Sequence, residues 1–346
     1  MRAGVGFFPL DRQLGLGRQG WSERVEQQVV KLAVRGSYGE AIEVYQELVG
    51  VSLAKTTGWQ RTQERGAGLK EARRRAAEEA WALPKRQEIM PGQVLAPVKC
   101  GVTMDGVLVY ILGEEWKEVK VGCLFEYETC LEYSRKTQEF QEVVKAKGQS
   151  YVAYLGEPEP FAKLLSAEAE RRGYDQAQER ACVGDGAKWI WNLSSLCFPT
   201  ACEIVDWPHA VEHLWLTAHL AETLNPAQRE RWAKQRKDEL WLGHVPSVMT
   251  AIQALAQDNP AHAAEFGTEA GYFGRNARRM QYQEFHEQGY PIGSGTGESG
   301  CKQLVSMRMK GPGMRWSRPG AENMLALRAE YLSGRWEDAW QLTCAA

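Results

Sequence analysis

The chain has 346 residues, of which 44% are hydrophobic and 25% are charged, a composition typical of a folded globular protein and not of a disordered one. No apolar run reaches the roughly 20 residues that a membrane-spanning helix needs, and the first residues show no secretory signal. The eight cysteines include no CxxC pair, which indicates a reduced, cytoplasmic protein and argues against a disulfide scaffold or a zinc ribbon.

Charge is divided unevenly along the chain. Residues 1–100 contain 16 Lys and Arg against 11 Asp and Glu, a balance of +5. Because the whole chain carries −2, residues 101–346 carry −7. A basic first third and an acidic remainder fit a polyanion-binding module joined to a part that needs carboxylates. Differences of this size are common, so the division alone is weak evidence.

Three short helices are expected near the N-terminus. The apolar spacing of residues 22–36 predicts a helix that stops at a glycine, and Ser37 with Glu40 predicts a capping box at the start of the next. Residues 53–66 predict a third helix. Such a series is typical of a helix-turn-helix domain, although a structural bundle with a solvated basic face has the same pattern. The candidate DNA contacts on the third helix include Lys55, Arg61 and Arg65.

The remaining chain predicts strands followed by helices. A strand pair around Gly113 and a third strand at 149–155 precede a helix that ends at Gly173. Two short strands follow, one ending at Asp185 and one at Asp206, and then a long helical stretch. The pattern predicts an α/β fold with an all-α insertion. The expected division is a helical DNA-binding region (1–90), a first part of the α/β core (91–208), the insertion (209–290) and closing core helices (291–346).

Four acidic residues are candidates for a metal site. Asp105 lies inside an apolar strand, where a charge is costly unless it is paired or binds a metal. Asp185 and Asp206 end predicted strands, where α/β sheets usually bind ligands. Glu298 follows a glycine-rich turn and opens a helix. Carboxylates that converge from strands and a helix suit two divalent ions in phosphoryl transfer.

Each acid also has an ordinary explanation. Asp105 and Asp185 are each followed by glycine, as in a common turn dipeptide. Asp206 is placed to cap the helix that begins near Pro208. Glu298 is a first-turn acid, which the helix dipole favours.

Two further motifs suggest other classes of protein. His209, Glu212 and His213 form an H-x-x-E-H run, which predicts a zinc peptidase, but nothing in the sequence singles out a further ligand. Gly295, Gly297 and Gly300 match a dinucleotide fingerprint without the strand that should precede it. These glycines more simply let the backbone turn tightly and place Glu298 near a phosphate.

Residues 298–318 are basic apart from Glu298. Five basic residues against one acid give a balance of +4, and Trp316 is available to stack on a base. A nucleic-acid track needs such a stretch beside an acidic centre, and the alternative is a solvated basic helix. The candidate DNA contacts here are Lys302, Arg308, Lys310, Arg315, Trp316 and Arg318.

Three blocks of the chain resemble bacterial insertion-sequence transposases of the Kra type, in the Mutator-like group of DDE transposases. The blocks are VGDGAKWIWNL, FPTACEIVDWPHAVEHLW and IGSGTGESGCKQLVSMRMKGPGMRWSRPGAENMLALRAEYLSGRW. The resemblance runs from PLDRQLGL, near residue 9, to about residue 340. Family members commonly carry more chain before the first segment, often with cysteine pairs, so the resemblance implies a missing upstream segment and leaves a truncated or repurposed copy open.

The resemblance implies an RNase H-like catalytic core with a helical insert between the second and third acids. Asp105, Asp185 and Glu298 resemble the three acids, and Asp206 with His209 matches the auxiliary C/D-x-x-H motif. The implied activity is cleavage of element ends and strand transfer into target DNA. The resemblance also implies two Mg²⁺ ions as cofactors, for which Mn²⁺ could substitute. The implied partner is double-stranded DNA, on which the protein would act as a homo-oligomer in the bacterial cytoplasm. The rival interpretation is a DNA-binding regulator that descends from such an enzyme.

Overall fold

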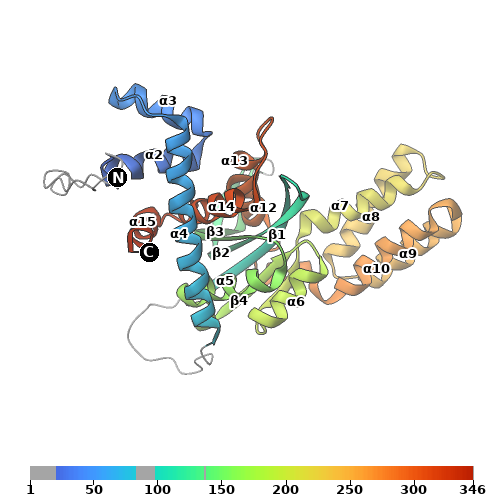
Figure 1. The fold of residues 1–346 in the computed structure, drawn as a ribbon. Coiled ribbons are helices and arrows are strands. Elements are labelled where there is room, and N and C mark those ends of the chain that lie inside the picture. The colour runs from blue at the N-terminus through green and yellow to red at the C-terminus, as the bar shows by residue number, and fades with distance from the viewer. Residues whose placement is uncertain (1–20, 83–97, 136–137, 346) are drawn as a thin grey trace, which may run out of the picture.

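The computed structural model describes residues 21–82, 98–135 and 138–345. The PLDRQLGL segment lies outside these residues. The fold combines helices with one five-stranded sheet in the order β3-β2-β1-β4-β5 (Figure 1). No helix among the described residues is both long and apolar enough to cross a membrane.

Three antiparallel strands form one side of the five-stranded sheet. β1 (Lys99–Ile111) and β2 (Glu115–Ser134) are joined by a tight turn in which Gly113 adopts φ 78°. This confirms the predicted strand pair. β3 (Glu139–Leu155) pairs along β2 for much longer than the predicted third strand at 149–155.

Two parallel strands complete the sheet. β4 (Glu179–Gly184) pairs with β1, and β5 (Cys202–Val205) pairs with β4. Adjacent parallel strands require a crossover connection. That connection is α6 (Lys188–Cys197), a helix that the apolar sequence KWIWNL did not reveal.

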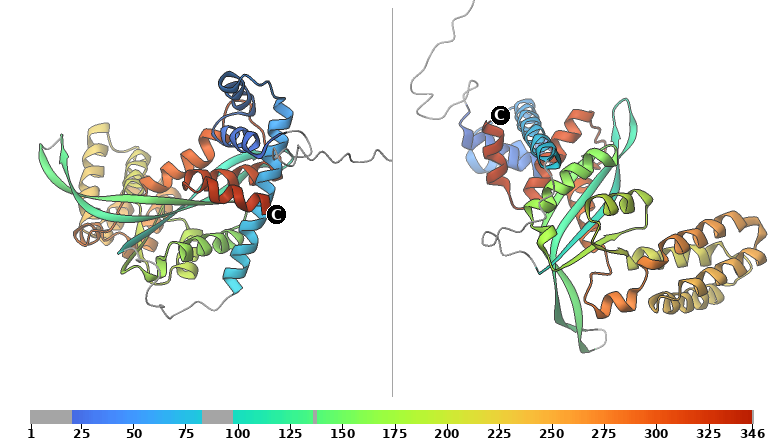
Figure 2. Two further views of the ribbon diagram at one scale, coloured as in Figure 1. Left: turned by 90° about the vertical axis from the view of Figure 1, so that its left-hand side faces the viewer. Right: turned by 90° about the horizontal axis from the view of Figure 1, so that it is seen from below.

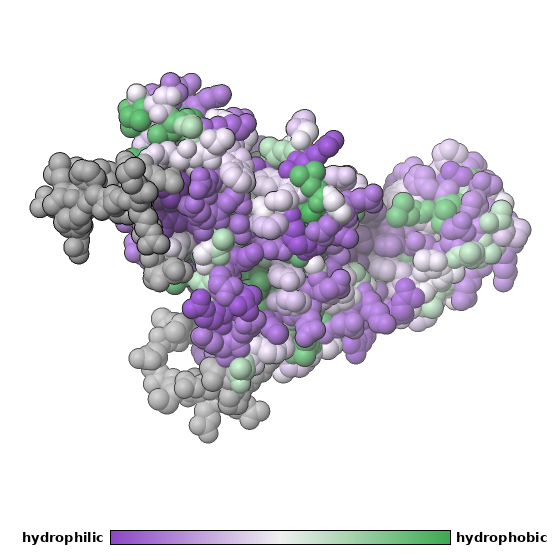
Figure 3. Space-filling view, viewed as in Figure 1, coloured by the Kyte–Doolittle hydropathy of each residue, from purple (hydrophilic) through white to green (hydrophobic). Residues whose placement is uncertain are grey.

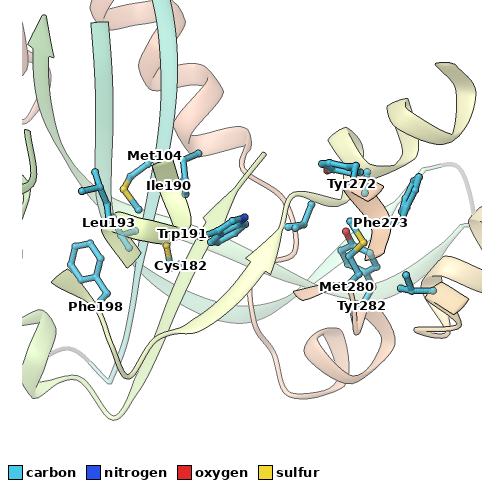
Figure 4. Close-up of a cluster of buried hydrophobic side chains, with 14 of the residues drawn as sticks. Met104, Cys182, Ile190, Trp191, Leu193, Phe198, Tyr272, Phe273, Met280 and Tyr282 are labelled. Atoms are coloured by element: carbon cyan, nitrogen blue, oxygen red, sulfur yellow. The ribbon is translucent and has the colours of Figure 1, made fainter. Parts of the chain in front are cut away.

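Helices cover both faces of the sheet, as the two views of Figure 2 show. α5 (Pro158–Arg171), α6 and the start of the insertion bury one face in a large core. Figure 4 shows part of that core, with Met104 and Ile190 near the sheet and Tyr272 and Tyr282 in the insertion. The other face packs against α14 (Arg318–Leu332) and α15 (Trp336–Ala345).

The helical insertion follows β5, as expected. Its bounds are α7 (Trp207–Leu220), α8 (Pro226–Trp241), α9 (Val245–Asp258), η2 (Pro260–His262), α10 (Ala263–Asn276), η3 (Ala277–Arg279) and α11 (Tyr282–Glu287). The chain then returns to the sheet through α12 (Gly295–Cys301), the π turn η4 (Lys302–Ser306) and α13 (Met307–Met309). A short helix, η1 (Tyr174–Gln176), precedes β4.

The N-terminal helices begin where their capping residues predict. α2 (Glu23–Arg35) lies between Ser22, which accepts from the amide of Val25, and Gly36. α3 (Tyr38–Val49) has both hydrogen bonds of the predicted capping box. The third helix differs, because α4 (Lys55–Ala82) continues through the expected stop at Gly66.

Tertiary packing explains why Gly66 does not end α4. A Cβ atom at Gly66 would lie 2.7 Å from both the Cβ and the carbonyl oxygen of Asn323 on α14. The glycine therefore serves the close approach of two helices. Gly68, two residues later, has room for a side chain, because its nearest neighbour, Thr343, is 4.0 Å away.

This contrast gives a prediction on stability. Gly66→Ala should destabilise the protein by about 2 kcal/mol, because the overpacked helices must separate. Gly68→Ala is the matched control and should be neutral or stabilising by up to about 1 kcal/mol, since alanine is the better helix former. Urea unfolding of both variants measures the difference. Equal stability of the two variants would show that the helices do not pack at Gly66.

Candidate active site

The strand register aligns three aspartates across the sheet. Thr103 of β1 pairs with Val183 of β4, so Asp105 and Asp185 each lie two residues beyond that pair on adjacent strands. Gly184 of β4 pairs with Val205 of β5, so Asp185 and Asp206 each follow directly. The carboxyl ends of β4 and β5 therefore present their acids at the level of Asp105.

Asp105 is half-buried on the sheet face that α12 covers. Its Oδ1 atom accepts a hydrogen bond of 2.6 Å from the amide of Gly106, and the thiol of Cys301 donates to its side chain. Burial raises the pKa of Asp105, and the negative charge of Asp185 raises it further. His209 and the two hydrogen bonds oppose this effect. The pKa of this carboxyl thus responds to residues of three other segments.

Asp185 lies in a tight loop that the insertion fixes. Its Oδ1 atom accepts a hydrogen bond of 2.7 Å from the amide of Ala187. Tyr272 of α10 donates its hydroxyl to the main-chain oxygen of Asp185 at 3.0 Å. The next residue, Gly186, has φ 98°, and a Cβ there would lie 2.6 Å from the Tyr272 ring. Contacts from the insertion therefore fix the position of the loop that carries Asp185.

Asp206 serves as a structural anchor. It is 1% exposed, and its Oδ2 atom accepts from the amide of His209 at 2.9 Å, which caps α7. Its Oδ1 atom accepts from the amide of Ser294 at 2.5 Å. This confirms the capping interpretation. Because both oxygens are engaged, Asp206 ties the start of the insertion to the segment that precedes α12.

The H-x-x-E-H residues form internal contacts. His213 Nδ1 lies 2.7 Å from a carboxylate oxygen of Glu269, and its ring stacks on Tyr272 with centroids 3.8 Å apart. His209 Nδ1 lies 3.8 Å from Glu212. Among residues 21–82, 98–135 and 138–345, no three His, Cys, Asp or Glu side chains are grouped as metal ligands. A zinc peptidase centre therefore has no geometric support here.

Glu298 lies in the first turn of α12. Cys301, one turn further along this helix, is the residue that bonds Asp105. Two glycines bring α12 close to the sheet, since a Cβ at Gly297 would lie 2.5 Å from Thr103 and one at Gly300 would lie 2.7 Å from Tyr151. Glu298 itself is exposed. The glycines thus hold α12, the helix that carries Glu298, close to the sheet, and a loop, not a strand, precedes them.

The donors suit a hard cation in type. Carboxylate oxygens are the ligands that Mg²⁺ prefers, and Asp185 is close enough for its charge to raise the pKa of Asp105. The described residues do not by themselves form a closed three-ligand group. A π turn follows α12 directly, and such turns are frequent at functional sites.

Two of the predicted DNA contacts after Glu298 are buried, and a third is held in an ion pair. Arg308 is 2% exposed, donates to the carbonyl of Ala33 at 2.9 Å and lies over the rings of Tyr38 and Trp316. The indole of Trp316 is buried and donates to the carbonyl of Met309. Arg318 makes a bidentate ion pair with Glu114 on the β1–β2 turn. Arg308 and Trp316 are therefore buried within the protein and are not placed to meet DNA, whereas Arg318 is partly exposed and its role as a DNA contact stays a prediction.

The other basic residues of the stretch face solvent. Lys302, Lys310 and Arg315 are exposed, and none has an ion pair in the part of the chain that the structure describes. Lys302 begins the π turn next to α12. These three residues are free to contact a phosphate.

The predicted DNA contacts on α4 also fall into two groups, one exposed to solvent and one held in ion pairs. Lys55 is exposed at the first residue of the helix. Arg61 pairs with Glu64 at 2.9 Å. Arg65 makes a bidentate ion pair with Glu26 on α2 and lies over the ring of Trp340 on α15. Arg65 therefore joins three helices.

The surface of α3 is partly apolar. Figure 3 shows apolar residues gathered over this helix, where Leu48 is 78% exposed.

Sequence reasoning missed two residues that shape the site. Tyr272 lies 87 residues from the main-chain oxygen that it bonds, so no local pattern identifies it. Cys301 follows Glu298 by one helical turn, a spacing that could have placed it beside the same strand.

In the comparisons with known proteins, no family model and no curated protein matches this chain. A functional assignment must therefore come from its own residues.

Proposed function

We propose that this protein is a DNA transposase of the Kra type, with an RNase H-like core that cleaves element ends and joins them to target DNA. The observation that carries the proposal is the alignment of Asp105 and Asp185 on adjacent strands, with Glu298 on the helix that bonds Asp105 through Cys301. A sheet of three antiparallel and two parallel strands with an insertion after β5 supports the RNase H-like assignment.

The proposed roles follow from the position of each side chain. Asp105, Asp185 and Glu298 would hold two Mg²⁺ ions, with Mn²⁺ as a substitute. When bound, such ions activate water or a 3′-hydroxyl and offset negative charge on the phosphate. Asp206 holds the two ends of the insertion together, and His209 lowers the pKa of Asp105 by its charge. The protein itself would contribute mainly by positioning the metal ions and the DNA.

DNA must approach a cluster of carboxylates, so nearby cations are required. Lys302, Lys310 and Arg315 are the free cations that follow Glu298. Lys55 extends the proposed phosphate contacts to the N-terminal helices, which we assign as the helix-turn-helix-like region. The partners are double-stranded DNA at the element ends and in the target, and a second copy of the protein.

The exposed cations give a prediction on salt dependence. Changing Lys302, Lys310 and Arg315 to Ala should weaken binding to all duplexes alike, because phosphate contacts carry no sequence information. Each lost contact should flatten the slope of log affinity against log salt by up to about 0.9. Titrations at three salt concentrations measure this slope. A matched triple change of Arg231, Lys234 and Lys237, which are exposed on α8 of the insertion, should leave it unchanged. An unchanged slope in the first variant would exclude phosphate contact.

Tyr272 gives a prediction on the geometry of the site. Tyr272→Phe removes the hydroxyl that holds Asp185 and should slow DNA cleavage about tenfold, the equivalent of one hydrogen bond. The matched control is Tyr282→Phe, because the Tyr282 hydroxyl is buried without a hydrogen-bond partner in the structure. That control should cleave at the parent rate. Cleavage rates of both variants, measured across an Mg²⁺ titration, test this prediction. Equal rates in the two variants would show that the Tyr272 hydroxyl has no role in the site.

The rival function is a DNA-binding regulator without strand-transfer activity. It is favoured by the absence of a closed three-ligand metal group among the described residues. The deciding experiment incubates the protein with labelled duplex from its flanking genomic DNA, with Mg²⁺ or with EDTA. Metal-dependent nicking at an element end supports the transposase. Sequence-specific binding without nicking in either Mg²⁺ or Mn²⁺ supports the regulator.

A further inference from the structure

The hairpin of β2 and β3 extends beyond the body of the protein. Its strands separate from the rest of the sheet after an irregularity at Leu124 and Glu126, and pair out to Ser134 and Glu139. Both views of Figure 2 show this ribbon projecting past the helices. We call residues 126–134 and 139–147 the arm.

One face of the arm is mostly apolar, with Glu142 as its one charged side chain, and is only partly covered. Near the body, Tyr127 packs against Tyr290, with ring centroids 6.4 Å apart, and Thr129 lies beneath Gly289. Further out, Leu131 is 66%, Tyr133 55% and Phe140 69% exposed. The rings of Tyr133 and Phe140 contact each other with centroids 5.5 Å apart. The apolar stripe thus continues past the point where the body covers it.

The opposite face of the arm is charged. Alternation places Glu128, Glu132, Lys145 and Lys147 on this face, where Lys147 pairs with Glu128 at 2.6 Å and Lys145 pairs with Glu132. A two-stranded ribbon is marginally stable alone in water. An amphipathic ribbon with uncovered aromatic side chains is therefore suited to a partner.

The outer edge of β3 is available for pairing. β3 lies at one end of the strand order, so no strand of residues 21–82, 98–135 or 138–345 lies beside its second edge. Nearer the body, Ser333 caps this edge by accepting from the amide of Tyr151. Edge strands of this kind are templates for antiparallel pairing with another chain.

We propose that the outer edge of β3 in the arm pairs with the same edge of a second copy, antiparallel, about a two-fold axis at Val143. The order of charged residues along β3 favours a second copy as the partner. In this register Glu139 lies opposite Lys147 of the second copy, and the axis repeats the pair. On the apolar face Phe140 lies opposite Ala146, where a large ring meets a small side chain. The apolar stripes of both copies then form one surface.

DNA is a less suitable occupant of the arm. Residues 126–147 contain five acidic residues and four basic ones, a balance of −1. A surface that binds a polyanion needs an excess of cations. The pairing does not depend on the proposed catalytic function, so either assignment can fail without the other.

Cysteine cross-linking of the full chain tests the axis. Cys130 lies opposite Val143 within the hairpin and must first be changed to Ser. In that background Val143→Cys should give a covalent dimer on mild oxidation, because residues facing each other across an antiparallel pair have Cα atoms about 4.5–5.5 Å apart. Gln141→Cys is the matched control. Its two copies would be roughly 13 Å apart, beyond disulfide reach.

A charge exchange tests the register independently. Glu139→Lys or Lys147→Glu should raise the dimer dissociation constant at least about tenfold, since each places like charges opposite one another twice. The double variant should restore the parent value, as measured by sedimentation. The proposal is overturned by equal cross-linking at positions 141 and 143, by no cross-linking at 143, or by no loss in the single variants. Loss of DNA affinity in Tyr133→Ala and Phe140→Ala together with an unchanged dimer would assign the arm to DNA instead.

Discussion

Replacing Asp185 with Asn or Glu298 with Gln is expected to abolish DNA cleavage while DNA affinity stays nearly unchanged. The amides keep the shape of the side chains but lose the charge that a hard cation requires. Because bound metal contributes several kcal/mol to phosphoryl transfer, the rate should fall at least about a hundredfold. Single-turnover cleavage of an element-end duplex in Mg²⁺ measures the loss, and filter binding measures the affinity.

The control for these variants is Asp238→Asn. Asp238 is exposed on α8 and undergoes the same chemical change away from the site. It should cleave DNA at the parent rate. Activity within about tenfold of the parent in either site variant, a loss of under about 1.4 kcal/mol, would remove that residue from the metal site.

The second large effect is expected from Arg328, which lies inside the protein without a carboxylate partner. It is 4% exposed and donates to the carbonyls of Leu304, Gln303 and Val34. These carbonyls belong to the π turn after α12 and to the end of α2. Burial lowers the pKa of Arg328 to about 10, so its guanidinium stays charged at neutral pH.

Arg328→Ala should lower the free energy of unfolding by about 3 kcal/mol, since buried acceptors are left without donors. For a chain of this size the melting temperature should fall by roughly 4 °C. Arg328→Lys should recover only part of the loss, because an ammonium cannot reproduce the planar fork. Arg231→Ala, an exposed change on α8, should have no effect. Calorimetry showing the same melting temperature for Arg328→Ala and the parent would contradict the role of Arg328.

Local signals predicted much of the fold. Apolar spacing over residues 22–36 predicted α2. Ser37 with Glu40 predicted the start of α3, because a capping hydrogen bond lies within one turn of the chain. The expected stop at Gly66 was wrong, since the reason for that glycine is Asn323, far away in sequence. α6 was missed because a short apolar run can be a buried strand or a buried helix, and only the parallel pairing of β4 with β5 requires it.

The site was predictable only as far as its acids. Strand ends identified Asp185 and Asp206, but the sequence could not show that Asp206 uses both oxygens on backbone amides. Local charge likewise predicted Arg308 as a DNA contact, whereas the folded chain buries it between α2 and Trp316. Burial of a charged side chain depends on partners that are distant in sequence, and periodicity does not contain that information.

Crystals of the protein with an element-end duplex and Mn²⁺ would test the central claim most directly. Anomalous scattering should show two metal peaks about 4 Å apart among the carboxylates of Asp105, Asp185 and Glu298. Metal bound instead at His209 and His213, or any one of the three acids more than roughly 10 Å from the other two in an ordered complex, would contradict a two-metal centre.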